Sequence, residues 1–267
     1  MIAAQTTENA AGPTSLSDVL GPGRLEPHFQ AVVDCETDTL RAVEALARWR
    51  TDGGDVLDVE PMLRRVEQFD AWSLLDATIL TLAVTQVASW RRLPGLSGLE
   101  LHANVSPESL RDPGLATRVA ETCRDGGLDP LALWLEVTER SVIEDLHGAA
   151  VTLDEMRKLG IRIWVDDFGK GCASFSYVKR LPIDGVKIDR SFISDIRTSD
   201  AGRAIVDAVV SIASQLTLRV IAEGVESEGQ ADAVRRLGVD AIQGFYYGRP
   251  EPASSGIAGF LSSPSRR

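Results

Sequence analysis

Short apolar runs rich in β-branched residues alternate with amphipathic helical stretches along most of this chain. The first two runs, residues 26–34 and 40–49, are separated only by CETDT. Because five residues are too few for a parallel crossover, we expect these runs to form an antiparallel hairpin. Two helical stretches follow at residues 59–69 and 71–91, the second with apolar residues at helical spacing.

Six further strands are expected after these helices, each an apolar run bounded by polar turns. They cover residues 99–105, 131–137, 161–166, 185–189, 219–223 and 240–245. Helical stretches such as 149–160 and 201–215 separate them, and 256–261 is expected to be the last helix. Eight strands alternating with helices predict an α/β fold, a (β/α)8 TIM-type barrel with an antiparallel first strand. The rival is an open doubly wound sheet, but no G-x-G-x-x-G follows a strand.

The two ends of the chain lack this alternation. Residues 1–22 are small and polar, without the charged segment and apolar core of a signal peptide, and we expect a flexible leader. The barrel then covers residues 23–262, and residues 263–267 form a disordered tail. No apolar run approaches the roughly 18 residues of a membrane span, so no membrane association is expected.

Composition narrows the classes of function. The formal net charge of −11 argues against binding a nucleic acid polymer or an anionic membrane, although bound cations would still admit a small anionic substrate. The three scattered cysteines suggest reduced thiols and a cytoplasmic location. The three histidines have no zinc-site spacing, so carboxylates and amides must hold any metal, which favours magnesium, manganese or calcium.

Ionisable or amide side chains stand at the carboxyl ends of almost all the expected strands, where barrels of this type carry their chemistry. They are Glu44, Arg48, Asn104, Glu136, Asp166, Asp167, Lys187, Asp189, Glu223, Glu226 and Gln243. Any one of them could be solvated or cap the next helix. Together, the seven carboxylates face only two cations, Arg48 and Lys187, and would repel one another by several kcal/mol.

Two divalent cations would remove this repulsion, and a metal pair is a common device for phosphoryl hydrolysis. The adjacent Asp166 and Asp167 are then explained as metal ligands, with Asp166 able to bridge both ions because the chain bends immediately afterwards. Another interpretation is a barrel lyase or aldolase that uses Lys187 as a Schiff base. It requires a depressed lysine pKa, which neighbouring carboxylates oppose.

Seven motifs in order along the chain resemble the signatures of the EAL family of cyclic di-GMP phosphodiesterases. They are EALAR (44–48), NVS (104–106), LEVTER (135–140), DDFGKG (166–171), PIDGVKID (182–189), AEGVE (222–226) and QGFYYGRP (243–250). The resemblance extends over about residues 25–262. It implies hydrolysis of cyclic di-GMP to linear pGpG with two Mg²⁺ or Mn²⁺ ions, and inhibition by Ca²⁺.

The resemblance also implies roles for individual residues. Glu44, Asn104, Glu136 and Asp166 would hold one metal, and Asp166, Asp167 and Glu223 the other. Lys187 would help to activate the attacking water and is catalytic together with Glu44, Asp166, Asp167 and Glu223. Gln30 and Arg48 would contact the substrate, supported by Asp189, Glu226 and Gln243, and Glu139 would anchor the loop that follows Asp167.

This chain departs from the family pattern in two places. Gln30 is followed by Ala31 rather than proline, and the loop usually written G-T-G-Y-S-S reads GKGCAS at residues 169–174. The missing hydroxyl and aromatic ring predict a more loosely held second metal, and we expect Lys170 to point into solvent. No expected metal ligand is lost, which favours an enzyme over the alternative, an inactive module that binds cyclic di-GMP or a protein partner.

The helix expected at residues 200–215 carries more apolar residues than a stripe facing the barrel requires. One explanation for these extra apolar residues is a helix that is well buried within the barrel protein. Because the family often dimerises on this side of the barrel, the resemblance favours a homodimer.

Overall fold

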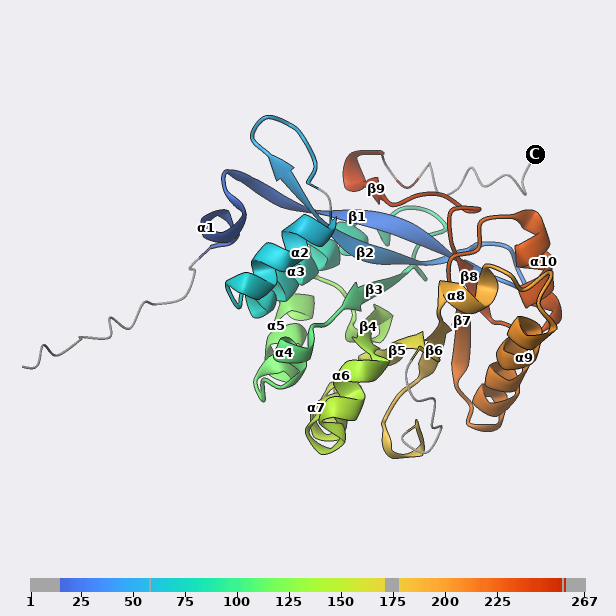
Figure 1. The fold of residues 1–267 in the computed structure, drawn as a ribbon. Helices are drawn as coiled ribbons and strands as arrows, with labels where there is room; N and C mark the ends of the chain where they lie inside the picture. The colour runs from blue at the N-terminus through green and yellow to red at the C-terminus, as the bar shows by residue number, and fades with distance from the viewer. Residues whose placement is uncertain (1–14, 58, 171–177, 256, 258–267) are drawn as a thin grey trace, which may run out of the picture.

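The computed structural model describes residues 15–57, 59–170, 178–255 and 257. Eight strands close into a barrel in the order β2 to β8 and then β1, which pairs with both β8 and β2, while the short β9 pairs with the middle of β1 at His28 and Phe29 (Figure 1). The strands are β1 (Gly23–Asp34), β2 (Leu40–Thr51), β3 (Glu100–Asn104), β4 (Leu133–Thr138), β5 (Arg162–Phe168), β6 (Gly185–Ile188), β7 (Arg219–Ala222), β8 (Ala241–Gln243) and β9 (Glu251–Pro252). This closed barrel confirms the predicted (β/α)8 architecture.

The antiparallel first strand is also confirmed. β1 pairs antiparallel with β2 from Gly23↔Thr51 onwards and with β8 at Val32↔Gln243, whereas neighbours from β2 to β8 are parallel. A consequence is that Gln30 and Glu44 are direct cross-strand partners. The hairpin therefore brings two predicted site residues together by local pairing alone.

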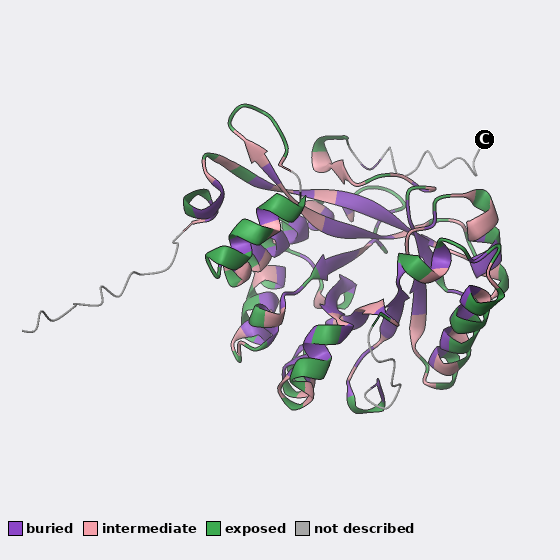
Figure 2. Ribbon diagram, viewed as in Figure 1, coloured by how far each residue is buried: buried purple, intermediate pink, exposed green. Residues whose placement is uncertain are grey.

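Helices form an outer ring whose inner face is buried and whose outer face is exposed (Figure 2). The α-helices are α1 (Leu16–Leu20), α2 (Val59–Gln68), α3 (Trp72–Trp90), α4 (Pro107–Leu110), α5 (Leu115–Gly126), α6 (Glu139–Glu144), α7 (Leu146–Lys158), α8 (Arg190–Ile193), α9 (Asp200–Gln215) and α10 (Glu228–Arg236). Short 3-10 helices are η1 (Pro130–Ala132), η2 (Val178–Arg180) and η3 (Ala253–Ser255). The expected helix 256–261 lies outside the described residues apart from Ile257, which is buried.

The start of the chain differs from the expected flexible leader over residues 15–22. Ser15 caps α1 in a capping box with Asp18, and Leu16, Val19 and Leu20 are buried in a cluster with α2 and β1. These three residues have the spacing of a buried helical face, but they lie in a short segment whose other residues are mostly small and polar. The folded unit therefore extends at least to Ser15.

Helix α3 is long and apolar enough, by length and composition, to cross a membrane. In the barrel it packs Ala83, Val84 and Val87 into the same core cluster as the strands, as a helix of the outer ring does.

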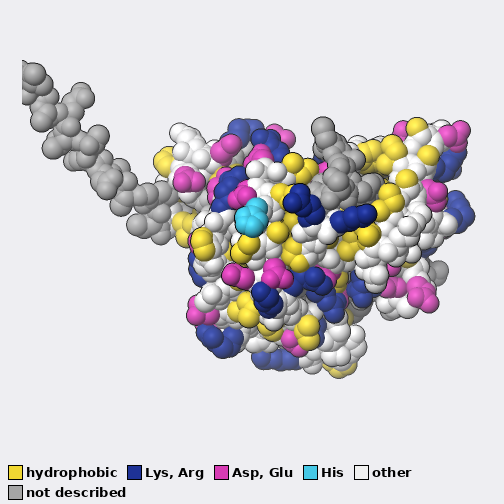
Figure 3. All heavy atoms as spheres, turned by 90° about the horizontal axis from the view of Figure 1, so that it is seen from below, with side chains coloured by type: hydrophobic (Ala, Val, Ile, Leu, Met, Phe, Trp, Pro, Cys, Tyr) yellow, Lys and Arg dark blue, Asp and Glu magenta, His cyan; other side chains and the backbone are white. Residues whose placement is uncertain are grey.

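On the face of the molecule shown in Figure 3, acidic and basic side chains are interspersed. The negative net charge of the chain is therefore not gathered on that face.

Below the carboxyl end of the barrel, the interior is filled by aromatic rings. Trp134 and Trp164 stack with centroids 4.5 Å apart, and both are buried together with Val32 and Ile221. Gly185 is required here, because a Cβ atom at that position would lie 1.9 Å from the Trp164 ring. This buried aromatic layer lies directly beneath the carboxyl ends of the strands.

Candidate active site

Lys187 stands at the centre of the carboxyl end of the barrel and is fully buried. Its Nζ lies 2.6 Å from Glu223, 2.8 Å from Glu136 and 3.4 Å from Glu44. Asp166 is also near, at 3.8 Å. These four carboxylates come from β2, β4, β5 and the residue after β7, so closure of the barrel gathers side chains that are far apart in sequence.

One ammonium group cannot balance four carboxylates, and the pKa values reflect this. Burial raises the pKa of Glu136 well above its usual value, and repulsion from Glu44 adds to the effect. Burial likewise raises the pKa of Asp166, and that of Glu223 to about 8. Glu44 differs: burial alone would raise its pKa, but Lys187 and hydrogen bonds from Gln243 and Asn104 lower it to about 2.

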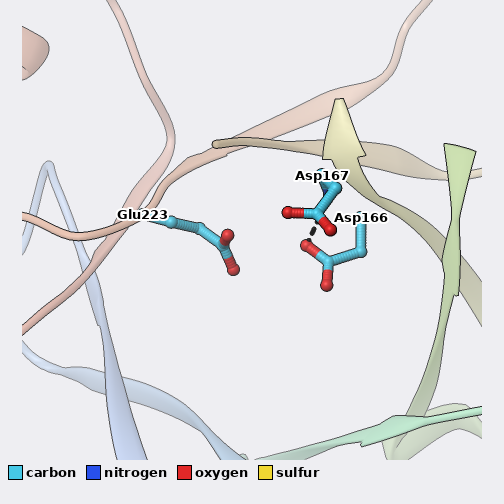
Figure 4. A group of neighbouring side chains, drawn as sticks. All are labelled: Asp166, Asp167 and Glu223. Atoms are coloured by element: carbon cyan, nitrogen blue, oxygen red, sulfur yellow. Dashed lines mark hydrogen bonds between the residues drawn. The ribbon is translucent and has the colours of Figure 1, made fainter. Parts of the chain in front are cut away.

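A local irregularity turns both aspartates of β5 towards this site. Successive side chains of a regular strand point to opposite faces, so Asp166 and Asp167 would normally diverge. The pairing of β5 with β6 shifts register between Val165 and Phe168, and Asp167 has a positive φ of 55°. As Figure 4 shows, the two carboxyl groups lie together and face Glu223, and Asp167 N–H donates to Asp166 Oδ1 at 2.8 Å.

These residues fit a divalent metal ion. One carboxylate oxygen from each of Asp166, Asp167 and Glu223 lies within 4.8 Å of the other two. Glu136 adds a buried carboxylate nearby, with Oε2 2.8 Å from Lys187 Nζ and Oε1 3.2 Å from His102 Nδ1. Hard oxygen donors and surplus negative charge suit Mg²⁺, Mn²⁺ or Ca²⁺.

Amide side chains hold the Glu44 carboxylate in place. Asn104 Nδ2 donates to Glu44 Oε1 at 2.8 Å, and Gln243 Nε2 donates both to Glu44 Oε2 and to Gln30 Oε1. Gln30 Nε2 donates in turn to Gly248 O at 3.1 Å. Asn104 and Gln243 are thus linked through one carboxylate, and Gln30 joins them through its hydrogen bond with Gln243.

A cavity of about 380 Å³ opens above this cluster and collects most of the predicted site. Its lining includes Gln30, Glu44, Asp167, Asp189, Glu223, Glu226 and Gln243. Arg48 does not line it: its guanidinium donates to Ala47 O at 2.8 Å, and the residue lines an adjoining apolar cavity with Met62, Leu63 and Trp72. Glu136 and Lys187 lie buried beneath the cavity.

Glu139, the first residue of α6, is buried and reaches the loop after β5. Its Oε2 accepts a hydrogen bond from Gly169 N–H at 3.0 Å. Gly169 has a positive φ of 101°, and a Cβ atom there would lie 2.8 Å from the Phe192 ring. Residues 171–174, where the loop departs most from the family pattern, lie outside the described residues.

The expectation that Lys170 points into solvent is wrong. Lys170 Nζ lies 2.7 Å from Asp167 Oδ1 and 2.9 Å from Asp189 Oδ2. The physical reason is the excess of carboxylates at the cavity, which attracts a nearby ammonium group even though half of the side chain is exposed. The position of Lys170 in the GKG sequence, close to Asp166 and Asp167, could have indicated this contact.

His102 is a second residue that the sequence reasoning did not assign to this region. It is buried between Glu136 and the tryptophan layer, with Nδ1 3.2 Å from Glu136 Oε1 and its ring 5.7 Å from that of Trp164. Burial lowers the pKa of His102 to about 3, so the ring is neutral. Its spacing of two from Asn104 on a strand is the signal that could have placed it in the barrel interior.

Comparison with known proteins agrees with this geometry. The EAL domain family model matches residues 14–250. The bifunctional diguanylate cyclase/cyclic di-GMP phosphodiesterase MucR of Pseudomonas aeruginosa is 33% identical over 243 residues, which cover 91% of this chain and 35% of MucR. This chain therefore spans only about a third of the length of the curated relatives it matches.

Solved structures are similar as well. The PaMucR phosphodiesterase in complex with c-di-GMP superposes with a TM-score of 0.81 at 33% identity, over 86% of this chain and 93% of that one. BlrP1 of Klebsiella pneumoniae, in a manganese/cy-diGMP complex, gives a TM-score of 0.77 at 27% identity, over 91% of this chain and 58% of that one. A calcium/cy-diGMP complex of BlrP1 gives a TM-score of 0.76 at 27% identity, over 85% of this chain and 56% of that one.

Proposed function

This chain belongs to the EAL domain family, and from that premise we propose that it hydrolyses cyclic di-GMP to linear pGpG with two bound divalent cations. The observation that carries the proposal is the cluster of Asp166, Asp167 and Glu223 beside Lys187 at the mouth of the barrel, close to Glu44, Asn104 and Glu136. Relatives and solved structures named for cyclic di-GMP hydrolysis or binding support the choice of substrate.

The metal ligands are proposed in two overlapping sets. Glu44, Asn104, Glu136 and Asp166 would hold one cation, and Asp166, Asp167 and Glu223 the other. Asp166 is shared, and the register shift of β5 is what lets its neighbour Asp167 face the same site. When bound, the cations would supply a water of lowered pKa as nucleophile and would neutralise charge on the phosphate.

The chain's own residues would orient the reacting groups. The Lys187 ammonium, positive because surrounding carboxylates raise its pKa against the opposing effect of burial, would donate a hydrogen bond to the attacking water. Gln30, Asp189, Glu226 and Gln243 line the cavity and would position the nucleotide. Arg48 would have to turn away from Ala47 O to reach a substrate phosphate.

The direct test is incubation of the purified chain with cyclic di-GMP and Mg²⁺ or Mn²⁺, followed by chromatographic separation of the nucleotides. We expect linear pGpG to accumulate, activity to disappear with excess chelator, and Ca²⁺ to support little turnover, since it is larger and less demanding in coordination geometry. Full activity after dialysis against EDTA would overturn the two-metal assignment. Binding of cyclic di-GMP without any product would instead identify a receptor.

A further inference from the structure

Lys170 connects two parts of the site that are separate in sequence. Its ammonium lies between Asp167, at the end of β5, and Asp189, immediately after β6. Asp189 is almost fully buried and also accepts a hydrogen bond from Ser191 N–H at 2.9 Å, at the start of α8. Lys170 is thus held on one side by a fixed carboxylate and on the other by a metal-ligand candidate.

The backbone directs Lys170 back over Asp167. Lys170 N–H donates to Asp167 O at 3.2 Å, which closes a tight turn. Asp167 and Gly169 both have positive φ, and Glu139 holds the turn through Gly169 N–H. A lysine at the last position of this turn therefore lies next to the Asp167 carboxylate without needing a long-range contact.

Charge explains why the ammonium stays there. Among the described residues, five carboxylates line the cavity, those of Glu44, Asp167, Asp189, Glu223 and Glu226, whereas the basic lining residues are Lys170 and Arg190. Burial would raise the pKa of Asp189, but hydrogen bonds from Lys170 and Ser191 lower it to about 2, so Asp189 remains an anion. Lys170 acts here as a counter-ion within the protein.

We propose that Lys170 is an internal counter-ion that competes with a divalent cation for Asp167, so that occupation of the Asp166, Asp167 and Glu223 cluster requires the ammonium to leave Asp167. This inference rests on the metal site of the proposed function. A divalent cation bound to Asp167 would repel an ammonium group on the same carboxylate, and the half-exposed Lys170, unlike the fully buried Lys187, has room to move away. After displacement, Lys170 keeps Asp189 as its partner, because that carboxylate is outside the proposed metal ligands.

Metal binding without nucleotide tests the inference. The full chain would be titrated with Mn²⁺ alone by isothermal calorimetry, and the step that includes Asp167 would be identified as the one lost in Asp167→Asn. In Lys170→Gln the Mn²⁺ concentration at half-saturation of this step should fall roughly tenfold, because a half-exposed, partly screened ion pair no longer competes. Lys170→Arg keeps the positive charge beside Asp167 and should remain within about twofold of the wild type.

Two matched variants separate this competition from general electrostatics. Arg190→Gln removes the other cation of the same cavity, which has no ion pair among the described residues, and should change half-saturation by about twofold or less. Lys158→Gln removes an exposed lysine paired with Asp154 on α7 and should change nothing. Circular dichroism would establish that each variant is folded.

The outcomes discriminate between the inference and the proposed function. Tighter Mn²⁺ binding in Lys170→Gln but not in Lys170→Arg supports the competition. Equal half-saturation in the wild type and Lys170→Gln, with cyclic di-GMP hydrolysis intact, would overturn the competition alone. If the wild type and Lys170→Gln both bound no Mn²⁺, the inference and the metal site of the proposed function would fall together.

Discussion

At the scale of single residues, the site is an arrangement of like charges around one ammonium group. Glu44 is distinct among these carboxylates, because Lys187, Gln243 and Asn104 together lower its pKa while the pKa values of Glu136, Asp166 and Glu223 are raised. Glu44 is also a cause of those raised values. Its removal should therefore take away both a proposed metal ligand and a carboxylate that folding favours in its ionised form.

In Glu44→Gln, turnover of cyclic di-GMP should fall about a hundredfold or more, because loss of a direct metal ligand should cost at least as much as loss of a residue behind one. The free energy of unfolding without metal should fall by roughly 1–3 kcal/mol at pH 7, because the lowered pKa of Glu44 means that folding favours its ionised form over a neutral side chain. Steady-state kinetics and urea unfolding would measure both. Near-normal turnover would contradict the role of Glu44, and the exposed Glu60→Gln on α2 is the control.

At the scale of elements, the β1–β2 hairpin carries Gln30 and Glu44 into the site and is held at its far end by charge. Arg50 donates two hydrogen bonds to Glu26, at 3.0 Å and 2.6 Å, in a bidentate pair. The hydrogen bonds from Arg50 lower the pKa of Glu26 to about 2, with His28 contributing. This pair is independent of the metal cluster and reports on the hairpin itself.

Because the folded pKa of Glu26 lies below the usual 4.5, its contribution to stability is present above pH 4.5 and is lost as the pH falls towards 2. Glu26→Gln should lower the free energy of unfolding by roughly 1 kcal/mol at pH 7, since water screens a pair near the surface. The difference from the wild type should shrink as the pH falls below about 4.5. Urea unfolding of both proteins as a function of pH measures this difference in free energy. A difference that grows on acidification would contradict the stabilising role of the ionised Glu26.

At the scale of the whole molecule, α9 presents an apolar face that the barrel does not cover. Val206, Val209 and Ala213 are buried against the barrel, whereas Ile205 is 41% exposed and Ala204 and Ala208 are exposed beside it. A helix that only had to pack on the barrel would carry polar residues at these positions. The homodimer expected from the sequence remains a prediction, and this face is its candidate interface.

Light scattering at micromolar concentration should therefore give a mass near twice 28.8 kDa for this chain. Ile205→Glu should shift the mass to that of the monomer, because a buried, unpaired carboxylate would destabilise the interface. Val151→Glu, at another exposed apolar position, on α7, should leave the mass unchanged. A mass of one chain for the wild type at every concentration would rule out this dimer.

Much of the fold was determined by local sequence patterns. Apolar runs and short turns located the eight barrel strands, and the CETDT connection determined the antiparallel hairpin, because the chain there is too short for any other path. Strand ends then identified the carboxylates and amides now found at the barrel mouth, since parallel strands present their carboxyl ends on one side. These features depend on residues close together in sequence.

Tertiary structure alone decided the rest. The register shift between β5 and β6, which turns Asp167 beside Asp166, depends on pairing with a strand that is distant in sequence. Lys170 meets Asp189, His102 lies against Glu136, and Arg48 turns away from the mouth because barrel closure determines which charges and cavities adjoin them. Electrostatic interaction acts through space and not along the chain, so it could be assessed only once the barrel had brought these groups together.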